Sequence, residues 1–131
     1  MSEKVIKIPG PNHAITIEKF EGQVVVSFAK GVIATTSNAL LLREATLPPV
    51  IYVPRVDIRM ELLEQTKHAT YCPYKGDASY FSVATDVENG INIAWSYETP
   101  YPAVSAIKDH LAFYADRVDI EFPPTSAPIQ A

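Results

Sequence analysis

The sequence predicts a mainly β domain with one or two short helices. Short segments rich in valine, isoleucine and aromatic residues recur along its 131 residues, and glycine, proline or asparagine separates them. No regular alternation of strands with long helical segments is present, which argues against a parallel α/β sheet. The length suits one folded domain, expected over residues 1–122, followed by a flexible proline-rich tail at 123–131 with little apolar surface to bury.

The first half of the chain is expected to be β structure. Residues 15–20 alternate apolar and polar side chains, Glu-Gly at 21–22 supplies a turn, and residues 23–28 are rich in valine, a pattern typical of a β-hairpin. Prolines flank the apolar run at residues 50–53, which places that run at a sheet edge or at a change of direction. Further extended segments are predicted at 32–36, 40–44 and 50–53.

The second half is expected to contain a second hairpin and two short helices. Asp57 can cap a helix that runs to about Glu64. Residues 79–84 and 91–96 form the predicted hairpin, across a loop that ends in Asn-Gly. Another helix is expected after Pro102, with an apolar stripe of Val104, Ile107 and Leu111, and the last strands are expected at 113–114 and 118–121.

Charge and hydropathy exclude several classes of protein. The net charge is −4, and the eleven lysines and arginines are scattered among acidic residues, so nucleic acid is not an expected partner. One well-placed cation would still be enough to bind a small anionic ligand. No apolar run approaches the ~20 residues that a membrane helix needs, and the N-terminus lacks the pattern of a secretory signal. We therefore expect a cytoplasmic protein without a membrane segment.

The only cysteine, Cys72, begins the tetrad Cys-Pro-Tyr-Lys. A glutaredoxin-type site needs a cysteine at the start of a helix and usually a second one three positions later, but here a lysine and then a strand pattern follow. Zinc is disfavoured because no paired Cys or His spacing is present, and no cofactor is expected. Three interpretations of Cys72 remain open: a small buried hydrophobe beside a turn, a contact to a ligand, or a nucleophile whose thiolate Lys75 favours.

Four ordered blocks carry a family resemblance: LLLREATLPPVIYVPRVDIRMELLE, CPYKGDASYF, AWSYETPYP and HLAFYADRVDI. Together they resemble the family known as domain of unknown function 427, over about Ile15 to Ile120. The resemblance implies a β-tent architecture, in which two small antiparallel sheets meet at an angle, as in Mss4-like proteins and B-type methionine sulfoxide reductases. Many such relatives bind zinc through two Cys-x-x-Cys pairs, which this chain lacks, so the implied fold contains no structural zinc.

The resemblance implies no particular activity. A nucleotidyltransferase label attached to the family would require a Gly-Ser motif followed by spaced metal-binding aspartates, and the sequence has no such arrangement. The sulfoxide reductases use a catalytic cysteine late in the chain, and no cysteine follows Cys72.

Polar and aromatic residues gather in three of the blocks. The second hairpin would bring the turn at 75–77 close to the strand end at 97–98. Trp95 and Tyr97, two positions apart, would share one strand face and offer a stacking wall. We therefore predict a ligand-binding cleft formed by Arg43, Tyr74, Lys75, Asp77, Trp95, Tyr97 and Glu98. In it, Lys75 or Arg43 would pair with an anionic group.

The sequence thus favours a module that binds a small polar or anionic ligand, or a protein partner. The alternative is a small enzyme that uses Asp77 or Glu98 as acid or base, with Cys72 as nucleophile. Structural roles compete with both interpretations, because a single tryptophan can anchor a core and Lys75 can simply close a turn. Exposed edge strands would permit a homo-oligomer, although nothing in the sequence selects one. The three histidines, His13, His68 and His110, are expected to have a structural role or to lie on the surface.

Overall fold

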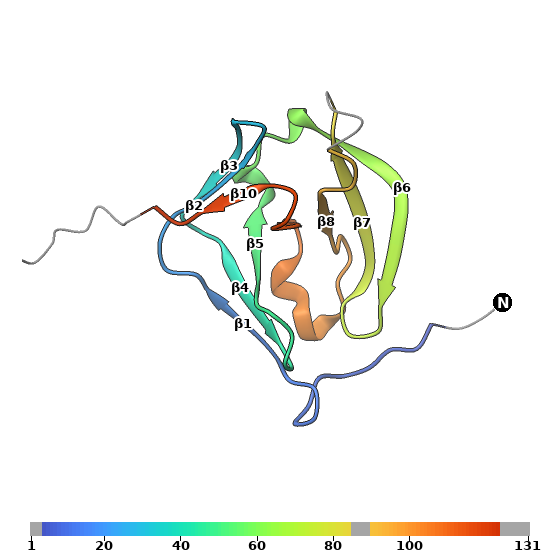
Figure 1. The fold of residues 1–131 in the computed structure, drawn as a ribbon. Helices are drawn as coiled ribbons and strands as arrows, with labels where there is room; N and C mark the ends of the chain where they lie inside the picture. The colour runs from blue at the N-terminus through green and yellow to red at the C-terminus, as the bar shows by residue number, and fades with distance from the viewer. Residues whose placement is uncertain (1–3, 85–89, 124–131) are drawn as a thin grey trace, which may run out of the picture.

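Two antiparallel sheets form the described part of the chain, residues 4–84 and 90–123 of a computed structural model (Figure 1). The predicted mainly β fold with two antiparallel sheets is therefore confirmed. The larger sheet has the strand order β1 (Ile15–Lys19), β4 (Leu40–Glu44), β5 (Val50–Pro54), β9 (His110–Phe113), β8 (Ala94–Ser96), β7 (Gly76–Val83) and β6 (Leu63–Cys72). The smaller sheet has the order β10 (Asp119–Glu121), β2 (Val24–Phe28) and β3 (Gly31–Thr36).

The helical segments are short and of the 3-10 type. They are η1 (Arg55–Asp57), η2 (Met60–Leu62) and η3 (Pro102–Ile107). No helix in residues 4–84 and 90–123 is long and apolar enough to cross a membrane. From residue 124 onward, the predicted tail lies outside the described residues.

The predicted hairpin at the start of the chain is wrong. β1 pairs with β4, with Ile15 opposite Glu44, whereas β2 pairs with β3 and β10 in the other sheet. The chain between β1 and β2 crosses from one sheet to the other and includes Gly22 at a φ of 117°. Local alternation identified both strands correctly, but their partners are determined by burial, because Val24 and Val26 are fully enclosed in the core.

The predicted helix from Asp57 to Glu64 is also wrong. Two separate 3-10 turns occupy its first part, and β6 begins at Leu63. The Asp57 side chain caps neither turn; its Oδ2 accepts a hydrogen bond from Thr36 Oγ1 at 2.7 Å. The sequence did not reveal β6, because an edge strand with mostly exposed polar residues lacks the alternation that marks a half-buried strand.

The helix predicted after Pro102 and the second hairpin are present. The helix is η3, with Val104 and Ile107 buried, although Leu111 lies in β9. β7 pairs with β8, with Tyr80 opposite Trp95, and the predicted connecting loop lies mostly outside the described residues. At the other end, Tyr101 N donates a hydrogen bond to Lys75 O at 3.0 Å, so the 75–77 turn packs against the segment that follows β8.

That close packing depends on Gly76. Its φ is +113°, a conformation that residues with a side chain rarely adopt, and a Cβ atom at this position would lie 3.4 Å from the carbonyl oxygen of Thr99. The glycine of the CPYKGD block therefore has a structural role: it holds Lys75 beside the chain that follows Trp95.

The central strands of the larger sheet bury side chains on both faces. One face packs against the smaller sheet around side chains such as Val53, Phe81 and Leu111. The other face carries Leu42, Tyr52 and further aromatic residues, and η3, drawn in orange in Figure 1, packs against it. The candidate site lies on this second, aromatic face.

Candidate functional site

A row of four residues crosses the aromatic face. Tyr52 of β5 lies opposite Ala112 of β9, Ala112 lies opposite Trp95 of β8, and Trp95 lies opposite Tyr80 of β7. Directly opposed residues on antiparallel strands point to the same face, so three large rings and one methyl group stand side by side. The small alanine leaves space between its larger neighbours.

A cavity of about 240 Å³ lies over this row. We call it the aromatic cavity. Aliphatic side chains and Pro48 complete its walls. Its lining includes five aromatic side chains, Tyr52, Tyr80, Trp95, Tyr97 and Tyr114, and two charged ones, Glu44 and Lys75.

The two charged residues form an ion pair. Lys75 Nζ donates a hydrogen bond to Glu44 Oε1, and both side chains are only 10% exposed. The other carboxylate oxygen, Oε2, lies 2.7 Å from His13 Nε2. Lys75 Nζ also lies 5.8 Å from the centre of the Tyr97 ring, within reach of a cation–π interaction. The cavity therefore contains one positive and one negative group in contact, with no excess charge from this pair.

The pKa of the Glu44 carboxyl is lowered by its surroundings. Burial alone would raise it, because a charge is poorly solvated inside a protein, but the hydrogen bonds and charges of Lys75 and His13 outweigh this effect. Glu44 is therefore ionised at neutral pH.

Three of the tyrosines that line the cavity, Tyr52, Tyr97 and Tyr114, remain neutral at physiological pH. Burial raises the pKa values of Tyr52 and Tyr97 well above the usual 10, although a hydrogen bond from Trp95 partly opposes the shift at Tyr52. Burial, and then a hydrogen bond with Tyr80, raises the pKa of Tyr114 to about 12. Neutral phenols offer both a donor and an acceptor, so the cavity can make hydrogen bonds of either kind.

The comparisons with known proteins give the family. The model of the family described as a domain of unknown function (DUF427) matches residues 16–123. The chain belongs to this family. No curated protein matches it. The description of the DUF427 family names no activity, so the function of this chain has to be argued from its own site.

Three of the predicted site residues line the aromatic cavity of this DUF427 domain: Lys75, Trp95 and Tyr97. Tyr74 lies next to it, because its ring stacks on His13 at a centroid distance of 4.0 Å and an interplanar angle of 7°. His13 in turn contacts Glu44. The role of His13 could not be found from the sequence, since it lies far from both partners along the chain and carries no motif.

Arg43 points away from the cavity. It follows the buried Leu42 on β4, and its side chain is 56% exposed, with Nε 3.6 Å from Glu18 Oε1. Strand alternation turns its neighbour Glu44 inward instead. The predicted site included Arg43, but the sequence did not show that its neighbour Glu44 is the residue that faces the aromatic side of the sheet.

The two carboxylates proposed as acid or base have partners outside the cavity lining. Asp77 accepts a hydrogen bond from Lys4 Nζ at 2.6 Å on the protein surface. Glu98 is bound by Arg55 Nη2 and by the Ser79 hydroxyl, both at 2.9 Å.

Cys72 is half-buried and packs against the aromatic cluster without lining the cavity.

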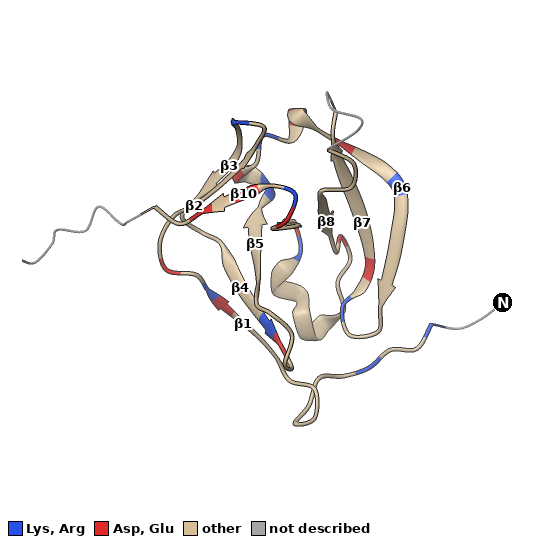
Figure 2. Cartoon of the chain, viewed as in Figure 1, with Lys and Arg blue, Asp and Glu red and all other residues tan. Residues whose placement is uncertain are grey.

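Charge is dispersed over the DUF427 domain. Figure 2 shows lysines and arginines interspersed with aspartates and glutamates on many elements. Within residues 4–84 and 90–123, no three His, Cys, Asp or Glu side chains gather as they would around a metal ion. The Glu44–Lys75 pair inside an aromatic cavity is therefore the most distinctive polar feature of the described chain.

The ionised state of Glu44 predicts how stability depends on pH. A carboxyl whose pKa is lowered by folding stabilises the protein above its ordinary value, 4.5, and this contribution is lost as the pH falls through the lowered folded value. Urea unfolding of the wild type and Glu44→Gln from pH 7 to pH 3 tests this. The stability advantage of the wild type should shrink as the pH falls from 4.5 to 3; an advantage that grows over this range would contradict the assignment.

Proposed function

We propose that this DUF427 domain binds a small ligand that presents a neutral polar group on a flat apolar ring. The observation that supports the proposal is the buried, charge-balanced pair of Glu44 and Lys75 in a cavity with five aromatic side chains. A buried ion pair is weak as a source of stability, since apolar residues of similar size often serve as well. Its presence beside an open cavity is better explained by recognition of a ligand.

The hydrogen-bonding capacity of the pair favours a neutral partner. An ammonium group has three donors, and Lys75 uses one of them on Glu44. A carboxylate has further lone pairs beside those that Lys75 and His13 occupy. A carboxamide offers its carbonyl oxygen as an acceptor to the Lys75 ammonium and its N–H as a donor to the Glu44 carboxylate. An anion would gain less, because Glu44 already neutralises Lys75 and would repel a second negative charge.

The aromatic walls favour a flat apolar part in the same ligand. Trp95 and Tyr114 lie with ring centroids 4.5 Å apart, and both line the cavity. Stacked or tilted aromatic contacts of this kind contribute about 0.5–1.5 kcal/mol beyond simple burial. Benzamide combines the two properties and is therefore a suitable first probe.

Trp95 makes the test direct, because it is the only tryptophan in the chain. Its fluorescence is followed during titration with benzamide and, for comparison, with benzoate. We expect a saturable change with benzamide and weaker binding of benzoate. Equal or tighter binding of benzoate would indicate that the site prefers an anionic ligand to a neutral one. The absence of a saturable change with either probe would contradict the proposal.

A matched pair of variants localises the binding. The double variant Glu44→Leu/Lys75→Met removes both charges together and should weaken benzamide binding by about tenfold or more, as expected for lost hydrogen bonds to charged groups. Arg43→Ala removes an exposed cation next to Glu44 on β4, and this variant should bind benzamide as the wild type does. Unchanged affinity in the double variant would place binding elsewhere.

A further inference from the structure

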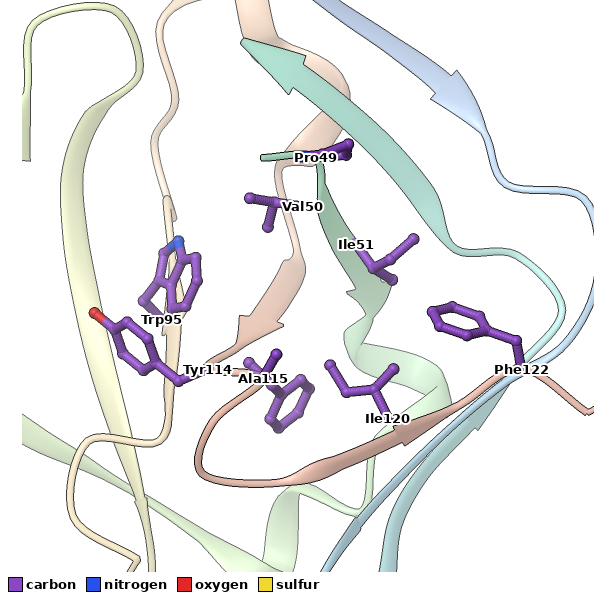
Figure 3. Close-up of a pocket in the computed structure, with 9 residues that line it drawn as sticks. Pro49, Val50, Ile51, Trp95, Tyr114, Ala115, Ile120 and Phe122 are labelled. Carbon is purple, nitrogen blue, oxygen red and sulfur yellow. The ribbon is translucent and has the colours of Figure 1, made fainter. Parts of the chain in front are cut away.

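A second hollow, of about 380 Å³, opens beside the aromatic cavity. We call it the apolar pocket (Figure 3). Its walls include Val50 and Ile51 from β5, Tyr114 and Ala115 after β9, Ile120 from β10 and the following Phe122. No charged residue is among the described residues that line it.

The pocket exists because two neighbouring strands separate. The pairing of β5 with β9 ends at Tyr52 and Ala112, so Ile51 and Phe113 are not paired across the gap. β5 remains paired with β4 as far as Val50, and β9 remains paired with β8 at Phe113. The smaller sheet supplies the opposite wall through Ile120, which Figure 3 shows across the pocket from Trp95 and Tyr114.

The two hollows share part of their lining. Val50, Trp95 and Tyr114 contribute to both. The rings of Trp95 and Tyr114 are tilted at 47° to each other and form a common wall. A molecule in either hollow would therefore lie against this common wall.

We propose that the apolar pocket holds the apolar tail of the ligand whose polar head binds Glu44 and Lys75. This inference rests on the proposed function and specifies its ligand class: a neutral amphiphile with a hydrogen-bonding ring at one end and an uncharged aliphatic chain at the other. Size supports it, because the aromatic cavity, at about 240 Å³, falls below the ~300–1,000 Å³ of most small-molecule sites. The adjoining pocket brings the combined space into that range.

An aliphatic tail would also cover apolar side chains of the pocket that face water. Phe122 is 52% exposed and Ile120 is half-buried, so part of the apolar lining still faces water. A chain that covers these side chains gains hydrophobic free energy for each methylene buried. A polar or charged extension would find no partner there and would lose its hydration.

A series of 4-alkylbenzamides tests the inference through Trp95 fluorescence. Benzamide is compared with its 4-methyl, 4-propyl and 4-pentyl derivatives on the full chain. Each added methylene that enters the pocket should tighten binding by about threefold, the value expected for burial of most of a methylene group. If benzamide binds but longer derivatives bind no tighter, this inference is overturned and the proposed function stands. If no member of the series binds, both fail.

Variants of the pocket wall confirm the place of the tail. Ala115→Leu narrows the apolar pocket without touching the aromatic cavity, so it should bind benzamide normally and lose the gain with chain length. Ala106→Leu makes the same change at an exposed position of η3 and should keep the gain. Phe122→Ala removes an exposed wall and should reduce the gain even if Ala115→Leu perturbs folding. A full gain in both Ala115→Leu and Phe122→Ala would overturn the assignment.

Discussion

Replacing Lys75 with methionine should lower the free energy of unfolding by about 3–5 kcal/mol, the range measured when one member of a buried ion pair is removed. The variant leaves Glu44 ionised in a site where its side chain is only 10% exposed. His13 remains as one partner, but the hydrogen bond at Oε1 is lost. Urea unfolding at pH 7 measures the effect, which is a large fraction of the about 5–15 kcal/mol by which domains of this kind are stable.

The double variant is the control for this prediction. Glu44→Leu/Lys75→Met removes the unpaired charge together with its partner, so much of the lost stability should return. A double-mutant cycle then gives the interaction energy of the two side chains. A loss of less than about 1 kcal/mol in Lys75→Met would show that the pair is solvated as surface ion pairs are.

Local signals predicted the elements that depend on neighbouring residues. Alternating apolar residues on either side of a loop ending in Asn-Gly identified the hairpin of β7 and β8, and the structure pairs Tyr80 with Trp95. That hairpin carries the 75–77 turn to the end of β8, so the proximity of Lys75 to Tyr97 was also predictable. The family blocks pointed to the two-sheet fold independently.

Elements fixed by distant residues were not predictable in this way. β1 is followed by a turn and a strand, as a hairpin is, yet its partner is β4. The pairing partner of each strand depends on where its side chains are buried. Val24 and Val26 of β2, a strand of the smaller sheet, are buried in the core. A turn signal constrains the chain locally and cannot show that the chain passes from one sheet to another.

The site was predicted in part for the same reason. Lys75, Trp95 and Tyr97 stand near one another in the hairpin, and clustering of charged and aromatic residues was enough to select them. Glu44 comes from the opposite part of the sheet and is 31 residues from Lys75. His13 reaches it from the segment before β1. Only the assembled sheet brings these three groups together.

The helix beside the site leads to the other large expected effect. Ile107→Ala should reduce the free energy of unfolding by about 2–5 kcal/mol, because it removes a fully buried side chain and leaves a cavity. Ile107 belongs to η3 and packs in one cluster with Tyr52, Tyr97 and Ala112. Urea unfolding gives the loss, and Ser105→Ala, at an exposed position of the same helix, should change stability by no more than about 0.5 kcal/mol.

The size of that effect follows from how η3 is held in place. It is a six-residue 3-10 segment without a side-chain cap, and Val104 within it has non-helical angles of φ −126° and ψ 28°. Such a segment has little intrinsic stability, so its position depends on the burial of Val104 and Ile107 against the aromatic face. Ile107→Ala should therefore loosen the support of Tyr97 and weaken benzamide binding as well. A variant that loses stability but binds benzamide with full affinity would show that the cavity keeps its shape without η3.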